Sequence, residues 1–181
     1  MASHKGHDNA TLYSACLLGP VCYWTAERLH GVVQSNGLAL SPLATTLLVV
    51  AAYLFSGLLL SNDLDITSRI YRRWGPFRLV WYPYQRLIPH RSLLSHGLVV
   101  GPLLRVLYLY VMLELLLLVA WRITALTGTR APYVEMGLDI SARLLPYLIW
   151  HPQISIPCVI GLVLAGFCHS LLDRLSTTLA I

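Results

Sequence analysis

Residues 38–60 have the sequence LALSPLATTLLVVAAYLFSGLLL and contain no Asp, Glu, Lys or Arg. The hydrocarbon core of a bilayer is about 30 Å thick, so an α-helix needs roughly 20 apolar residues to cross it. This segment therefore predicts a membrane-spanning helix.

The composition of the whole chain agrees with this prediction. Of the 181 residues, 56% are hydrophobic and 12% are charged, and the mean hydropathy is +0.64. Soluble domains carry about 25% charged residues, so a lipid bilayer is the expected surroundings. No internal repeat, low-complexity tract or linker divides the sequence, which predicts one membrane-embedded helical domain over residues 1–181.

Residues 10–33, 92–121 and 154–174 are the other predicted spans. Within 92–121 only Arg105 and Glu114 are charged, and their spacing puts them on roughly opposite faces of a helix. Each is therefore expected to pair with another helix or to reach the headgroups. The predicted fold class is an all-α integral membrane bundle of about four transmembrane helices.

Two amphipathic stretches are expected to lie along the membrane surface. Residues 66–88 interleave arginines with Trp and Tyr, a composition suited to an anionic membrane surface. Residues 138–150 place Asp139 and Arg143 at helical i,i+4 spacing before an apolar and aromatic run. The first is predicted to be an interfacial segment. The second is predicted to be an interfacial helix, with partial insertion into the membrane as the alternative.

Basic residues dominate the loop between the second and third predicted spans. Arg69, Arg72, Arg73, Arg78, Arg86 and Arg91 are opposed there by Asp63 and Asp65. Because Lys and Arg in short loops stay cytoplasmic, four spans place this loop and both termini on the cytoplasmic side. The same loop carries most of the net charge of +5, so membrane topology explains that charge and nucleic acid is not an expected partner.

This topology brings His and Asp residues from four parts of the sequence to one face of the membrane. The candidate metal ligands are His7, Asp63, Asp65, His90, His96, His169 and Asp173. Imidazole and carboxylate groups suit Zn²⁺, Mn²⁺ or Fe²⁺. A structural zinc ion needs four ligands, so a dinuclear centre is one hypothesis.

The Asp pair closes an uncharged helix, at the end where the helix dipole disfavours carboxylates. A cation bound by Asp63 and Asp65 would compensate their charge. The alternative is compensation by the nearby arginines.

His90 and His96 are six residues apart, which on one continuous helix would point them in different directions. If Ser92 is a helix N-cap, His90 lies in the preceding loop and can bend toward His96. The alternative is an interfacial histidine pair that hydrogen-bonds to backbone.

His169 and Asp173 share one helix face and suit two ligands, or one ligand and its orienting carboxylate. The alternative is a simple His–Asp hydrogen bond that closes the helix. His7 is either a ligand or a solvated residue beside a helix cap.

The sequence also resembles a family of small cyanobacterial membrane proteins described as uncharacterised metal-binding proteins. The motifs that carry the resemblance are His7-Asp8, Asn62-Asp63-Leu64-Asp65, Tyr71-Arg72-Arg73-Trp74-Gly75, Trp81-x-Pro83-Tyr84-Gln85 and His90-Arg91-Ser92-x-x-Ser95-His96-Gly97. More distantly, the order of His and Asp motifs looks like that of the YdjM-like membrane-bound, metal-dependent hydrolases, in which a His often follows the Asp-x-Asp. Here Ile66 occupies that position. The resemblance implies metal binding by the seven candidate ligands, and a location in the cell inner membrane or the thylakoid membrane.

The leading functional hypothesis is a metal-dependent hydrolase that acts on a lipid or another phosphoester at the cytoplasmic membrane surface. Arg72, Arg73 and Arg91 would hold the anionic group, and no residue is assigned as catalytic. The alternative is a non-catalytic subunit or assembly factor of a membrane protein complex, in a photosynthetic membrane if the resemblance holds. Transport is less favoured because ionisable groups on a transport pathway should lie near the middle of the membrane.

Overall fold

The computed structural model describes residues 4–35, 40–90, 92–129 and 131–178, and within these ranges the side chains of residues 4, 5, 7, 33–35 and 176–178 are outside the description. All regular secondary structure in the described ranges is helical. The all-α prediction is therefore confirmed.

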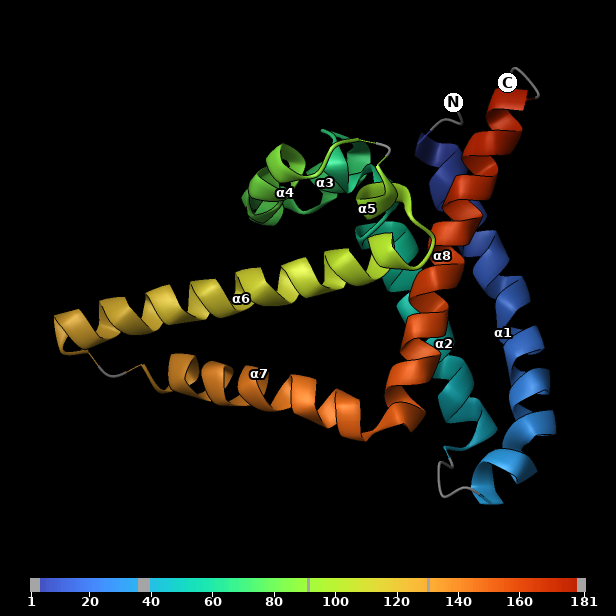
Figure 1. Ribbon diagram of the computed structural model, residues 1–181, viewed down its shortest axis with the longest axis horizontal. Helices are drawn as coiled ribbons and strands as arrows, with labels where there is room; N and C mark the ends of the chain where they lie inside the picture. The colour runs from blue at the N-terminus through green and yellow to red at the C-terminus, as the bar shows by residue number, and fades with distance from the viewer. Residues whose placement is uncertain (1–3, 36–39, 91, 130, 179–181) are drawn as a thin grey trace.

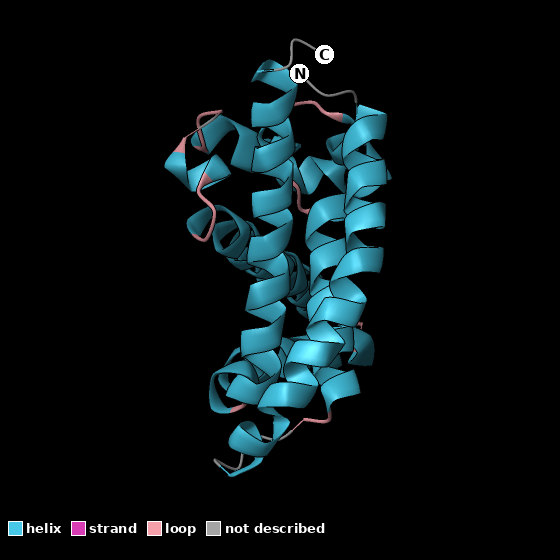
Figure 2. Ribbon diagram, turned by 90° about the vertical axis from the view of Figure 1, so that its right-hand side faces the viewer, coloured by secondary structure: helices cyan, strands magenta, loops and turns pink. Residues whose placement is uncertain are grey.

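Three long helices form an upright bundle: α1 (His4–Ser35), α2 (Pro42–Leu59) and α8 (Pro152–Thr178) (Figures 1 and 2). The Ser41 hydroxyl accepts a hydrogen bond from the Ala44 amide and caps the start of α2, where Pro42 supplies the fixed φ that suits a first turn. Helices α2 and α8 approach each other closely at Gly161. A Cβ there would lie 2.9 Å from the Tyr53 amide nitrogen.

Within the described ranges, three segments are long and apolar enough to cross a membrane: Pro42–Asp65, Val100–Thr127 and Pro152–Leu175. They overlap three of the four predicted spans. The fourth prediction, residues 10–33, lies within α1, which is a long helix but is not one of these three.

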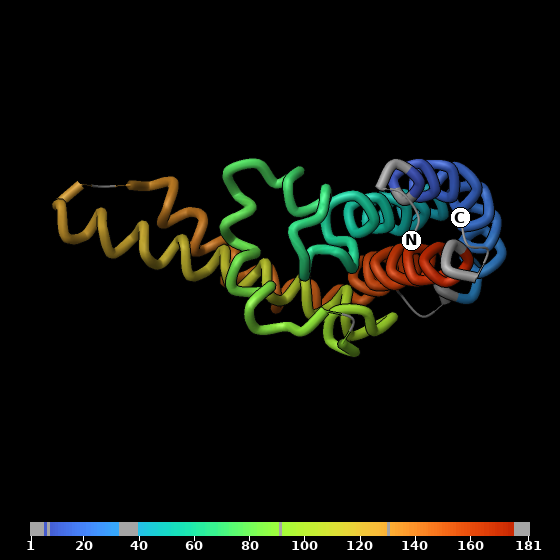
Figure 3. Tube along the Cα trace, turned by 90° about the horizontal axis from the view of Figure 1, so that it is seen from above, coloured from blue at the N-terminus to red at the C-terminus, as the bar shows by residue number. Residues whose placement is uncertain are grey.

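The third predicted span differs most from the structure. It was expected to begin at Ser92, but Ser92 caps a single-turn helix, α5 (Leu93–His96), and the long helix α6 (Val100–Thr127) begins only after Gly97. A side chain at Gly97 would collide with the Leu93 carbonyl oxygen, so the chain turns sharply there. Helix α6 then extends sideways from the bundle instead of running along it (Figures 1 and 3).

Helix α7 (Pro132–Trp150) returns along α6, so that the two form a hairpin (Figure 1). Asp139 and Arg143 are paired at 2.8 Å on its exposed face, as their i,i+4 spacing predicts. The helix starts six residues before the predicted segment 138–150, because Pro132 at its first turn is a good helix start.

The predicted interfacial segment, residues 66–88, contains three short helices. These are α3 (Arg69–Arg73), the 3-10 helix η2 (Gly75–Trp81) and α4 (Tyr82–Leu87). Together with the 3-10 helix η1 (Asn62–Asp65) they form a cap over one end of α2. Trp81 and Tyr84, expected at the membrane surface, are fully buried in the core of this cap.

Candidate metal centre

The candidate metal ligands gather where the cap meets the bundle, at the end where α1 begins and α8 finishes (Figure 1). Helix η1 directly follows α2 and carries Asp63 and Asp65. The loop before α5 and the end of that helix supply His90 and His96, and α8 supplies His169 and Asp173. The predicted convergence of distant segments is therefore present in the structure.

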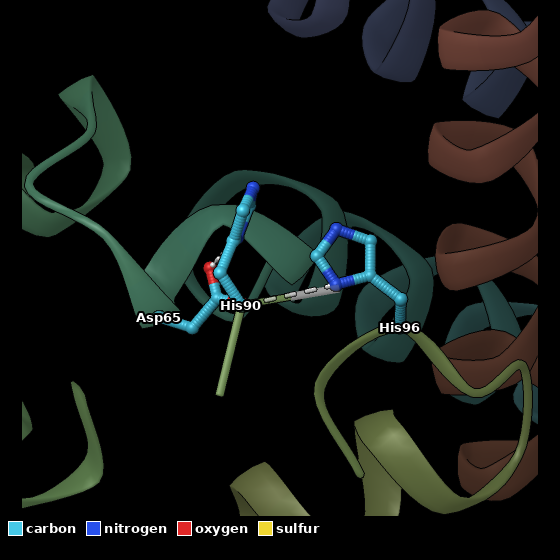
Figure 4. Close-up of side chains that lie close together, drawn as sticks. All are labelled: Asp65, His90 and His96. Atoms are coloured by element: carbon cyan, nitrogen blue, oxygen red, sulfur yellow. Dashed lines mark hydrogen bonds and ion pairs between the residues drawn. The ribbon is translucent and has the colours of Figure 1, made fainter. Parts of the chain in front are cut away.

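Asp65, His90 and His96 form the tightest cluster, with one ligand atom from each lying within 4.8 Å of the others (Figure 4). His90 Nδ1 donates to Asp65 Oδ1 at 2.9 Å, and His96 Nδ1 lies 3.7 Å from Asp65 Oδ2. The two imidazoles face one another nearly edge to face, with ring centroids 5.2 Å apart. Both histidines thus converge on one carboxylate.

Local structure explains why His90 and His96 approach each other. The Ser92 hydroxyl accepts a hydrogen bond from the Ser95 amide, which begins α5 after His90 as predicted. The fully buried Ser95 hydroxyl bonds to His96 Nδ1 at 2.9 Å. The N-cap at Ser92 therefore leaves His90 in the preceding loop, while Ser95 fixes the ring of His96.

The cluster is buried on the carboxylate side and open on the imidazole side. The Asp65 side chain has no exposed surface, whereas the side chains of His90 and His96 are 35% and 20% exposed. Burial lowers the pKa of His96 below its ordinary value of 6.5, although the negative charge of Asp65 opposes this shift. His96 is therefore held in the neutral form that a metal ligand requires.

The donor set fits a divalent metal ion. Imidazole nitrogens and carboxylate oxygens are common ligands of divalent metal ions, and one such atom from each of the three residues lies within 4.8 Å of the others. Asp65 Oδ2 is buried, and no described residue donates a hydrogen bond to it. Such an acceptor is costly to bury, and a cation beside it would compensate that cost.

A second group of predicted ligands meets at His169. Its Nε2 atom lies 3.4 Å from Asp173 Oδ2 on the same helix and 3.6 Å from Asp63 Oδ1 in η1. The structure thus brings six of the seven predicted ligands into two neighbouring clusters. The side chain of the seventh, His7, lies outside the described residues.

The predicted anion-binding arginines have different surroundings. Arg72 is exposed. Arg73 donates to Asp8 Oδ2 at 2.7 Å and to the Leu58 carbonyl oxygen at 2.6 Å, so it ties α1 to the cap. Arg91 lies outside the described residues. The anion-binding role of all three stays a prediction.

Sequence reasoning assigned no site role to Arg105 or Asn62. Arg105 is fully buried and donates to Asn62 Oδ1 and to the Ser95 carbonyl oxygen. Its charge within an apolar helix was the available signal, and the expected pairing with other segments is confirmed. The only sequence feature that pointed to a site role for Asn62 was its position beside Asp63.

Comparison with known proteins gives one family match. The model of a family described as "Uncharacterized metal-binding protein (DUF2227)" matches residues 2–181. No curated protein and no solved structure matches the chain.

Proposed function

Since the chain belongs to the DUF2227 family of uncharacterized metal-binding proteins, we propose that Asp65, His90 and His96 bind its metal ion and that the protein is a hydrolase. The observation that carries the proposal is the convergence of two imidazoles and one buried carboxylate on a site open to the surface. A divalent ion held by three protein ligands keeps a position for water and lowers the pKa of that water.

The residues of the site have distinct roles in this proposal. Asp65 supplies the negative charge, and its burial makes its attraction for a cation strong. His90 and His96 complete the ligand set from the exposed side. The Ser95 hydroxyl holds His96 Nδ1, which leaves Nε2 as the ligand atom of His96, because the hydrogen bond at one ring nitrogen orients the other.

The proposed substrate is a phosphoester at the membrane surface, such as a lipid headgroup. Exposed arginines of the cap, Arg72, Arg78 and Arg86, give this end of the molecule a positive charge that would attract an anionic group. The same arginines favour a cytoplasmic location for the site and both termini, in a cell inner membrane or thylakoid membrane. A fourth span formed by α1 belongs to this proposal. The distant resemblance to YdjM-like hydrolases supports the choice of hydrolysis.

The test uses the full chain purified in detergent without chelators. Metal content is measured by elemental analysis, and phosphate release is measured on vesicles that contain phosphatidic acid. We expect His90→Ala and His96→Ala to lose both metal and activity, while the control His151→Ala, at the far end of α8, keeps both. Metal-free wild type would overturn the proposal entirely, and metal without hydrolysis of any phosphoester would overturn the catalytic part.

A second candidate function is a non-catalytic subunit or assembly factor of a membrane complex. The hairpin of α6 and α7 favours it, because large apolar side chains such as Leu126, Tyr133 and Trp150 are more than 80% exposed there. Such a surface needs lipid or a protein partner. Copurification of a larger complex with a metal-loaded but inactive protein would support this function.

A further inference from the structure

His169 is a buried histidine that faces two carboxylates at once. Only 7% of the residue is exposed, and its Nε2 atom lies 3.4 Å from Asp173 Oδ2 and 3.6 Å from Asp63 Oδ1. Both distances exceed the usual range of about 2.7–3.2 Å for an N–H···O hydrogen bond. They come close to the roughly 3.0–3.4 Å that separates two ligand atoms on one cation.

The other side of the His169 ring is fixed. Ser61, itself buried, places its hydroxyl 3.0 Å from His169 Nδ1. When the Nδ1–H group donates to Ser61, the lone pair of Nε2 points toward the two carboxylates. This is the arrangement in which a hydrogen bond at one ring nitrogen orients the other as a metal ligand.

Two carboxylates of low exposure flank His169. The side chains of Asp63 and Asp173 are only 17% and 33% exposed, and both face the Nε2 atom. A divalent cation would neutralise both carboxylates and leave His169 neutral. One imidazole and two carboxylates suit Zn²⁺, Mn²⁺ or Fe²⁺.

Helix η1 connects this cluster to the first one. Asp63 faces His169, while Asp65, two residues later, faces His90 and His96. The buried side chain of Leu64 separates the two carboxylates and anchors η1 in the core of the cap. One short helix therefore supplies a carboxylate to each cluster.

We propose that Asp63, His169 and Asp173 form a second divalent-cation site beside Asp65, His90 and His96, so that the centre holds two ions. This inference deepens the proposed function and rests on its metal-binding part. The partner of the second site is a divalent transition-metal ion, held by one histidine and two aspartates.

The test is the stoichiometry of Mn²⁺ bound by the full chain in detergent after chelation and removal of the chelator, measured by calorimetry and elemental analysis. Wild type and the control His151→Ala should bind two equivalents. His169→Ala and the isosteric Asp173→Asn should each bind one, and so should His96→Ala through loss of the other site. Circular dichroism and gel filtration confirm that each variant is folded, and Asp173→Asn replaces His169→Ala if the latter is not.

The results separate the two proposals. In one outcome, wild type binds one equivalent of Mn²⁺, Asp173→Asn keeps it and His96→Ala loses it. This result would overturn the second site and leave the first intact. In another outcome, the one equivalent of Mn²⁺ is kept by His96→Ala and lost by Asp173→Asn. This result would support the site at His169 and overturn the first. No binding by wild type would overturn both.

Discussion

Arg105 in α6 donates a hydrogen bond of 2.9 Å to the side-chain oxygen of Asn62 in η1. Its other terminal nitrogen donates to the Ser95 carbonyl oxygen at 2.6 Å, and Asn62 in turn donates to the Ser170 hydroxyl at 3.2 Å. Ser95 precedes His96, and Ser170 follows His169. One chain of hydrogen bonds therefore connects Ser95, next to His96 of the first cluster, with Ser170, next to His169 of the second.

Replacing Arg105 by lysine should weaken metal binding without removing a ligand. A single ammonium group cannot span Asn62 and Ser95 as the guanidinium fork does. Leaving one buried acceptor unpaired costs about 1–3 kcal/mol, so the thermal midpoint in detergent should fall, and the Kd for Mn²⁺ should rise about 10–100-fold. Calorimetry and thermal unfolding measure these changes. The exposed Arg122→Lys is the control on the same helix, and unchanged affinity in folded Arg105→Lys would disprove the bridging role.

Ser61→Ala should act on the second site alone. The variant loses the group that orients His169, so affinity at that site should fall about 10–100-fold, while the first site keeps its ligands. Two-site calorimetric titration with Mn²⁺ separates the two affinities. Ser56→Ala is a matched control, because Ser56 is also buried on the α2 side but bonds to the Leu162 carbonyl oxygen instead. Equal titrations for the two variants would contradict the assignment.

In the metal-free protein, the contribution of His96 to stability should decline as the pH falls below about 6.5. Burial lowers the pKa of His96 in the folded state, so the unfolded chain binds more protons between that lowered pKa and 6.5. The contribution of His96 is therefore complete above pH 6.5 and declines below it. Thermal unfolding of wild type and of His96→Asn, followed from pH 8 to pH 5, measures the effect. Parallel pH profiles for the two proteins would be inconsistent with a depressed pKa at His96.

Gly161→Ala should destabilise the contact between α2 and α8. The added Cβ would lie 2.9 Å from both the Tyr53 amide nitrogen and the Ala52 Cβ, and these atoms belong to a helix that cannot yield easily. We expect a cost of about 1–3 kcal/mol, typical of overpacking, seen as a lower midpoint of thermal unfolding in detergent. Gly19→Ala is the control, because a Cβ there meets no atom within 4 Å and alanine favours the helix. A midpoint at or above that of wild type for Gly161→Ala would exclude the close approach.

Local sequence patterns predicted the helices and many of the site residues. The uncharged runs around Thr46 and Leu162 predict long apolar helices because each run is itself long enough to cross a bilayer. The cap at Ser92 also follows from neighbouring residues, since a hydroxyl bonds an amide three positions later. These interactions involve residues close in sequence, so the sequence alone contains the information.

Other features depend on contacts between distant segments. Trp81 has the composition of an interfacial residue but is buried, because the short helices of the cap fold around it. The direction of α6 depends on the turn at Gly97 and on the anchorage of Arg105 to two other segments. No local pattern specifies these contacts.

Composition and periodicity were enough to predict that the chain is helical and apolar and that its His and Asp residues fall near helix ends. They could not decide which residues share a site, because the spacing of Asp65 and His90 says nothing about their distance in space. Only the tertiary structure separated the ligands into one cluster at Asp65 and another at His169. The physical reason is that the packing of α8 on α2 and the anchorage of η1 set those distances, and both depend on side chains far apart in the chain.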